Sequence, residues 1–145
     1  MATTQNPYCI SVIINDVSAM PVYHCCKLNS SGEAVICDTA GEGVFGIVQE
    51  LPANDGEAGL VCVFGACKAA ATGAFTAGDK LAVTVTGELD DTETALKVNT
   101  SDSGAAADPV IGSHIAAHAL ADASGAGSIV EVLFTGPCQF KVTAG

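Results

Sequence analysis

Short apolar segments recur along the chain at intervals of about ten residues, each bounded by Gly, Asp, Asn or Ser, and this spacing constrains the fold more than any other feature. Many short strands separated by turn residues are typical of a barrel or a sandwich. The sequence therefore predicts a small all-β domain of about ten short strands. The expected strands are 9–15, 22–28, 33–37, 43–51, 59–64, 80–86, 95–99, 110–120, 128–134 and 139–143.

The stretch FTAGDKLAV at 75–83 places an acid and a base side by side in a turn. Gly78 can adopt a positive φ, and Asp79 can hydrogen-bond the backbone that follows it. From Leu81 onward the apolar residues recur with period two, which is typical of a strand. Because no histidine or second acid lies close in sequence, we interpret Asp79 and Lys80 as part of a hairpin turn rather than a reactive pair.

Signals for helices are scarce. Sixteen Gly residues, together with many Thr and Ala residues, fit short strands and tight turns better than helices. Only CKAAATGAF at 67–75 indicates a helical turn, and Gly73 predicts that this turn is brief.

The length of 145 residues predicts one domain with a core of its own. Apolar residues make up 49% and charged residues 14% of the chain, which excludes a disordered protein. Residues 1–8 are polar and lack periodicity, so we expect an N-terminal arm that is flexible in the free protein. Residues 9–145 are expected to form a single β-barrel-like domain.

The charge balance excludes the usual nucleic-acid partners. The chain has five Lys, no Arg and sixteen acids, which gives a formal net charge of −11. Such a protein neutralises phosphates poorly and lacks the guanidinium group that reads guanine. The first residues do not resemble a signal peptide, and no apolar run has the length of a membrane helix, so we expect synthesis in the cytoplasm and no membrane partner.

The residues that could bind metal or catalyse a reaction have unfavourable spacing. In HCC at 24–26 neighbouring side chains would point to opposite faces of a strand, and Cys62 and Cys67 lack a second pair at matching spacing. His114 and His118 in HIAAH lack the adjacent glutamate of a zinc protease, and no Gly-x-Ser-x-Gly motif occurs. We therefore expect no bound metal, no cofactor and no catalytic residues.

Seven cysteines cannot all pair within one chain, and a protein made in the cytosol normally keeps them as thiols. We interpret most of them as small core residues. If a bridge forms in air, Cys9 with Cys138 is the first pair to test, because each lies near a chain end.

The acid-rich stretch GELDDTETALKV at 87–98 lacks the alternating ligand spacing of a calcium loop, so we interpret it as a solvated hairpin tip.

The segment LVCVF at 60–64 is apolar on both of its faces, so we expect it to be covered on both sides. In small antiparallel domains the second cover often comes from another subunit, which predicts an oligomer. The face with Leu60, Cys62 and Phe64 is the expected subunit interface.

Several motifs follow one another along the chain, namely GEAVI, GVFGIVQE, GEAGLVCVFGACKA, FTAGDKLAVT and VIGSHIAAHALADASGAGSIVEVLF. In this order they resemble the capsid cement, or head-decoration, proteins of tailed bacteriophages. The similarity covers about 20–135, and it rests on the order of motifs that are individually rich in Gly, Ala and Val. The N-terminal region and the tail after Phe134 match less clearly, and seven cysteines exceed what the family leads one to expect.

The resemblance implies a barrel-like domain that assembles as a homotrimer on the outer surface of an icosahedral head. There it would bind the major capsid protein near threefold positions and clamp adjacent capsid subunits, without enzymatic activity. Asn6, Pro7 and Tyr8 at the end of the arm are the expected capsid contacts, with Tyr8 as an anchoring ring. Alternatives are a tail or fibre module, a surface carbohydrate-binding β module, or a small enzyme that uses Cys or His.

Overall fold

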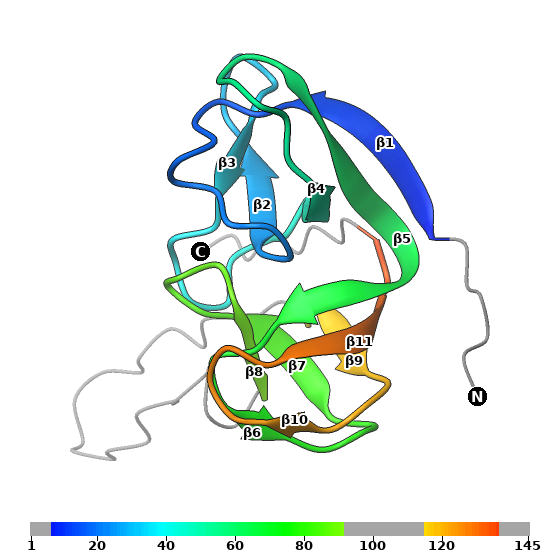
Figure 1. The fold of residues 1–145 in the computed structure, drawn as a ribbon. Coiled ribbons are helices and arrows are strands. Elements are labelled where there is room, and N and C mark those ends of the chain that lie inside the picture. Colours follow the sequence, from blue (N-terminus) through cyan, green and yellow to red (C-terminus); the bar gives the residue numbers. More distant parts are fainter. Residues whose placement is uncertain (1–6, 92–114, 137–145) are drawn as a thin grey trace, which may run out of the picture.

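The computed structural model describes residues 7–91 and 115–136, and these residues form eleven strands and no helix (Figure 1). The predicted all-β fold is confirmed. The expected strands 95–99 and 139–143 lie outside the described residues. The strands are β1 (Tyr8–Ile13), β2 (Cys25–Leu28), β3 (Ala34–Ile36), β4 (Gly46–Glu50), β5 (Ala58–Ala70), β6 (Ala74–Phe75), β7 (Lys80–Val83), β8 (Leu89–Asp91), β9 (Ala117–Ala119), β10 (Ala123–Ser124) and β11 (Ile129–Phe134).

Nine strands form one curled antiparallel sheet in the order β3-β2-β4-β5-β11-β9-β7-β8, and β1 also pairs with β5. Strands β6 and β10 form a separate two-stranded sheet. Figure 1 shows two halves: β1 to β4 occupy the upper half, and β7 to β9 with β11 occupy the lower half. Strand β5 belongs to both, so it is the element that joins them.

The two halves meet on β5 at Phe64 and Gly65. Up to Phe64 the strand pairs with β1 and β4, whereas from Gly65 onward it pairs with β11. Gly65 has a φ of 105°, a region that favours glycine, and Figure 1 shows β5 bending from the upper half into the lower one. A bend of this kind lets a single strand serve two sheet surfaces that face in different directions.

The upper half has a hydrophobic core on each face, because successive residues of a strand point to opposite sides, and the larger of the two cores continues into the lower half. Val61 belongs to the smaller core and Cys62 to the larger one, and both are fully buried. The smaller core consists of Val12, Ile14, Met20, Cys26, Ala34, Val48 and Val61. The larger core consists of Cys25, Cys37, Val44, Ile47, Cys62, Cys67, Ala69, Ala71, Phe75, Leu81, Val83, Leu89, Ala116, Ala117, Ala119, Ala123, Val130, Val132 and Phe134.

This arrangement confirms that LVCVF is covered on both sides at its centre, but it corrects the expected source of the cover. Strand β1 and the loop that contains Met20 supply the smaller core, so the same chain covers the face that carries Val61. The doubly apolar strand therefore does not require a second subunit.

The predicted helical turn at 67–75 is wrong. Strand β5 continues through these residues to Ala70, and β11 pairs with it from Gly65 to Ala70. Lys68 lies opposite Glu131, and Ala70 lies opposite Ile129. The helix propensity of Ala is a weak preference, and here the ladder with β11 overrides it.

The turn in FTAGDKLAV is confirmed, but it does not belong to a hairpin, because β6 before it pairs with β10 and β7 after it pairs with β8 and β9. Gly78 has a φ of 93°, and the carboxylate of Asp79 accepts hydrogen bonds from the backbone N–H of Thr76 at 2.9 Å and from its hydroxyl at 3.1 Å. Asp79 thus bonds the preceding backbone, not the following backbone as expected. Lys80 is exposed and begins β7 opposite His118.

The acid-rich stretch is only partly solvated, which corrects the interpretation of 87–98 as a hairpin tip. Asp90 lies in β8 with 6% of its surface exposed, and it pairs with Ala82 of β7. Burial raises the pKa of the Asp90 carboxyl, which accepts a hydrogen bond from the N–H of Asp91. The short edge strand β8 thus buries an acidic side chain as well as an apolar one. Residues 92–98 lie outside the described residues.

Candidate interaction surface

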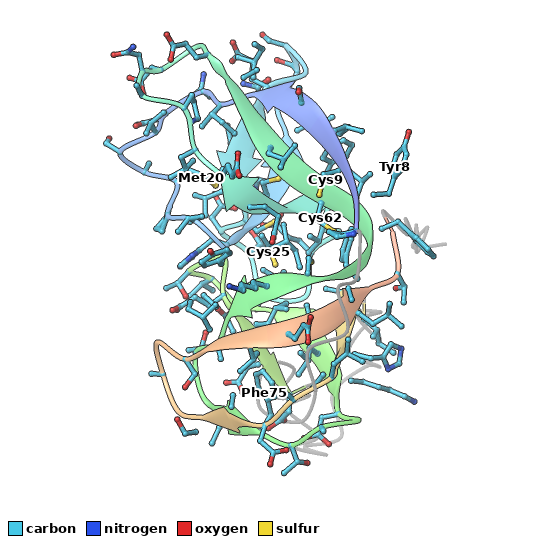
Figure 2. The ribbon with its side chains drawn as sticks, turned by 45° about the vertical axis from the view of Figure 1, so that its right-hand side comes forward. Tyr8, Cys9, Met20, Cys25, Cys62 and Phe75 are labelled. Carbon is cyan, nitrogen blue, oxygen red and sulfur yellow. The ribbon has the colours of Figure 1, made fainter. Side chains whose placement is uncertain are left out.

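Two exposed aromatic residues are paired across β1 and β5. Tyr8 is 66% exposed and Phe64 is 58% exposed, and they are paired in the β1–β5 register. The register shifts between Tyr8 and Cys9, because Cys9 pairs with Cys62 and leaves Val63 without a direct partner. Such a bulge redirects the side chains beside it. Figure 2 shows the Tyr8 ring pointing away from the ribbon into solvent.

The residues expected at the capsid contact and at the subunit interface meet at this pair. Tyr8 comes from the first set and Phe64 from the second. Tyr8 is the first residue of β1, so the predicted arm 1–8 ends before it. Pro7 is half-buried, and a Cβ added to Gly65 would lie 3.3 Å from its Cα. Asn6 lies outside the described residues.

The other two residues of the expected interface differ from Phe64. Leu60 is half-buried, and Cys62 is fully buried in the larger core. The assignment of Cys62 to an interface is therefore wrong, because no part of its surface is available to another subunit. The sequence showed that the strand has two apolar faces, but it did not show that the larger core of the same chain covers Cys62.

A second exposed stripe runs along the outward face of β11. Ile129, Glu131 and Leu133 are exposed, whereas the residues between them are buried. This alternation places Glu131 at the surface. Leu133 lies opposite Ala66 of β5 and His118 of β9. The period-two pattern of IVEVLF is the sequence signal that could have identified Ile129 and Leu133 as surface residues.

The stripe leads toward the aromatic pair. Phe134 lies opposite Gly65, the residue after Phe64. A Cβ added to Gly136 would lie 3.7 Å from Cδ2 of Phe64, so the chain that leaves β11 passes beside this ring. Pro7 and Gly136 both lie where the described chain ends or begins. The aromatic pair is therefore next to both of these points.

His24 and Glu88 belong to a polar network that closes the β7–β8 turn against β2. The Nδ1 atom of His24 lies 3.1 Å from the carbonyl of Val22, and its Nε2 atom lies 3.9 Å from the Glu88 carboxylate. Thr86 and Thr72 donate hydrogen bonds to the same carboxylate at 2.8 and 3.3 Å. In this network the two threonine hydroxyls are oriented by Glu88 rather than by His24.

Metal ligands are not gathered in the described part of the chain. In residues 7–91 and 115–136, no group of three or more His, Cys, Asp or Glu side chains is placed to hold a metal ion. His118 lies in β9, so this end of HIAAH is extended rather than helical. His114 lies outside the described residues.

Six of the seven cysteines are described, and all six are free thiols: Cys9, Cys25, Cys26, Cys37, Cys62 and Cys67. Five of them are buried, which confirms their interpretation as small core residues, and Cys9 is half-buried. Burial raises the pKa of Cys26 to about 12 and raises the pKa of Cys25 well above its usual value. Cys138 lies outside the described residues, so the pair Cys9–Cys138 remains a prediction.

Comparisons with protein-family models, with curated proteins and with solved structures found no match. Within the two described ranges, no helix has both the length and the apolar character needed to cross a membrane. The features that bear on function are therefore the order of the sequence motifs and the exposed surface of the fold.

Proposed function

We propose that this protein is a structural component of a phage virion that binds the outside of an icosahedral head. It stabilises the head by clamping adjacent major capsid proteins. The observation that carries this proposal is the exposed pair Tyr8 and Phe64, which stands on a curved sheet at the place where the expected capsid contact begins. Exposed aromatic residues supply a large share of the binding energy in protein interfaces.

The electrostatics of the chain support an exterior position. With a net charge of −11, the protein would be repelled by packaged DNA rather than attracted to it. Lys27 is paired with Asp38 and Glu42, which further reduces the positive charge available to phosphates. Decoration needs many modest contacts repeated over a head, and such contacts add up when the bound units are linked.

A homotrimer is part of the proposal, and the stripe on β11 provides a surface for it. Ile129 and Leu133 are 47% and 37% exposed, and Glu131 and Lys68 lie opposite each other between them. Apolar residues beside charges of opposite sign are suited to a contact between copies. Phe64 remains in this proposed interface region, whereas Cys62 does not.

Sedimentation equilibrium and electron microscopy test the proposal together. At micromolar concentration we expect a species of three times the 14.4 kDa chain mass, and on virions of the source we expect trimeric density on the outer head surface. A stable monomer in solution together with density for single copies would contradict the trimer. Density on the tail or fibres, with bare heads, would contradict the function.

The Tyr8 ring provides a sharper test of how the protein binds heads. We expect Tyr8→Ala to weaken binding to undecorated heads by about tenfold or more, because removing an interface anchor typically costs more than 1 kcal/mol. The thermal midpoint of the Tyr8→Ala variant should stay unchanged, since the Tyr8 ring is 66% exposed. Binding is measured by co-sedimentation of heads with titrated protein.

Val85→Ala is the matched control, because Val85 is 63% exposed but lies on the β7–β8 turn. This variant should bind heads as the unmodified protein does. Deletion of residues 2–6 separates the contribution of the arm from that of the ring. Equal affinity for Tyr8→Ala and Val85→Ala would remove Tyr8 from the proposed contact.

The same aromatic pair supports a second candidate, a surface carbohydrate-binding module. Sugar rings can pack on exposed aromatic faces, and both rings here are largely exposed. The chain has no Trp, so Tyr fluorescence can report binding directly. Saturable quenching by oligosaccharides that is lost in Tyr8→Ala would favour this candidate, and unchanged fluorescence would count against it.

A further inference from the structure

Three thiols meet where β5 bends. Cys9 of β1 and Cys62 of β5 are direct partners in the antiparallel register. Cys62 and Cys67 would lie about 16 Å apart on a straight strand, at 3.3 Å per residue. The bend at Gly65 instead brings Cys67 close enough to Cys62 for each thiol to shift the pKa of the other, and Cys9 also affects the pKa of Cys62. Figure 2 labels Cys9 and Cys62, which lie on the neighbouring strands β1 and β5 above this bend.

We propose that Cys9 and Cys62 are a modification site, at which a small-molecule disulfide such as oxidised glutathione converts the two thiols into a cross-strand disulfide. Directly opposed residues of antiparallel strands have Cα atoms about 4.5 to 5.5 Å apart. Disulfides span Cα separations of about 4.4 to 6.8 Å. The register therefore places the two Cα atoms at a separation that a disulfide can span. This inference is independent of the proposed function.

The exposure of the thiols sets the order of the chemical steps. Cys9 is half-buried, whereas Cys62 and Cys67 are buried, so the reagent can reach only Cys9 of the three. The Cys9 thiolate attacks one sulfur of oxidised glutathione and displaces one glutathione thiolate. The Cys62 thiolate then attacks the sulfur of Cys9 in this mixed disulfide and displaces the second glutathione. The protein loses two electrons and two protons, and the reagent is reduced to two thiols.

The environment of Cys62 suits it to the second step. The neighbouring Cys67 thiol lowers the pKa of Cys62 against the effect of burial, and smaller lowering contributions come from the backbone of Phe64 and from the Cys9 thiol. Cys67 retains its proton, because the neighbouring Cys62 and burial both raise its pKa. Burial and the neighbouring Cys62 raise the pKa of Cys9, so we expect the first step to be slow and to accelerate with increasing pH.

The other described thiols compete poorly. Cys25, Cys26 and Cys37 are fully buried, so a reagent in solution does not reach them in the folded protein. Cys67 could replace Cys9 only after Cys9 has reacted, by exchange with the bridge already formed. The bridge between Cys9 and Cys62 would close a long loop and fasten β1 one residue after Tyr8. We expect it to raise the thermal midpoint by about 5 to 10 °C.

The test incubates the reduced full-length chain with excess oxidised glutathione at mildly alkaline pH, followed by mass spectrometry and peptide mapping. We expect a mass loss of two hydrogens, a linked peptide that joins Cys9 and Cys62, and the raised thermal midpoint. Cys9→Ser should abolish all three effects, and it should fold because Cys9 is half-buried at the start of a strand. Cys138→Ser is the matched control and should retain all three.

Several outcomes would overturn the inference. These are seven free thiols after prolonged incubation, a bridge that maps to Cys62–Cys67 or to Cys9–Cys138, and an unchanged mass loss in Cys9→Ser. Arrest at a stable mixed disulfide on Cys9 would also overturn it, because Cys62 would then not reach the sulfur of Cys9.

Discussion

Gly46→Ala is expected to destabilise the protein by at least about 3 kcal/mol of unfolding free energy, and to leave little folded material at growth temperature. Gly46 begins β4 opposite Cys26 and has no surrounding space. A Cβ at this position would clash with Cγ1 of Val61 and lie 2.7 Å from the carbonyl oxygen of Cys62. Val61 is fully buried, and the Cys62 carbonyl belongs to the backbone of β5, so neither can move without disturbing the sheet. Urea denaturation, followed by circular dichroism, measures the loss.

Gly43→Ala is the matched control for this variant. Gly43 precedes the same strand, and neither glycine has a φ in the left-handed region. A Cβ at Gly43 would meet no atom within 4 Å. We expect its unfolding free energy to stay within about 0.5 kcal/mol of the unmodified protein. Equal stability of the two variants would show that β4 does not pack against β5 as described here.

The strands were largely predictable from the sequence, because their signal is local. Period-two alternation and turn residues located the strands that correspond to β1, β4, β7 and β11. The glycine with positive φ in FTAGDKLAV was equally local, since a tight turn needs Gly78 whatever the rest of the chain does. Strand β5 extended beyond its predicted end because its second half pairs with β11, which follows more than fifty residues later in the chain.

The candidate surface was less predictable, because it depends on register and on distant packing. Tyr8 and Phe64 were assigned to two different contacts, and only the pairing of β1 with β5 places them side by side. Cys62 was assigned to an interface because alternation shows which residues share a face but not what covers that face. Asp90 was expected in solvent for the same reason, since its burial depends on the position of β8 against β7.

Phe134→Ala is expected to cost about 3 to 5 kcal/mol of unfolding free energy, which is a large part of the total stability of a typical domain. Phe134 is the largest of the fully buried side chains and lies in the larger core. It is opposite Gly65 on β5 and Ala117 on β9, two residues with little or no side chain to fill the space that the ring would vacate. The variant should therefore leave a cavity at the place where β5 changes its pairing partners.

Phe64→Ala is the control, because it removes an aromatic ring that is exposed rather than buried. Phe64 lies one residue before Gly65 on β5, but it is 58% exposed, so we expect a loss of less than about 1 kcal/mol. Urea denaturation of both variants gives the comparison. The slopes of unfolding free energy against urea concentration should match if both variants expose the same surface on unfolding. A similar loss in both would mean that the Phe134 ring is not the support of the bend. A larger loss for Phe134→Ala would show that packing around the Phe134 ring holds the two halves of the sheet together. This packing lies at the same bend of β5 beside which Tyr8 and Phe64 are exposed.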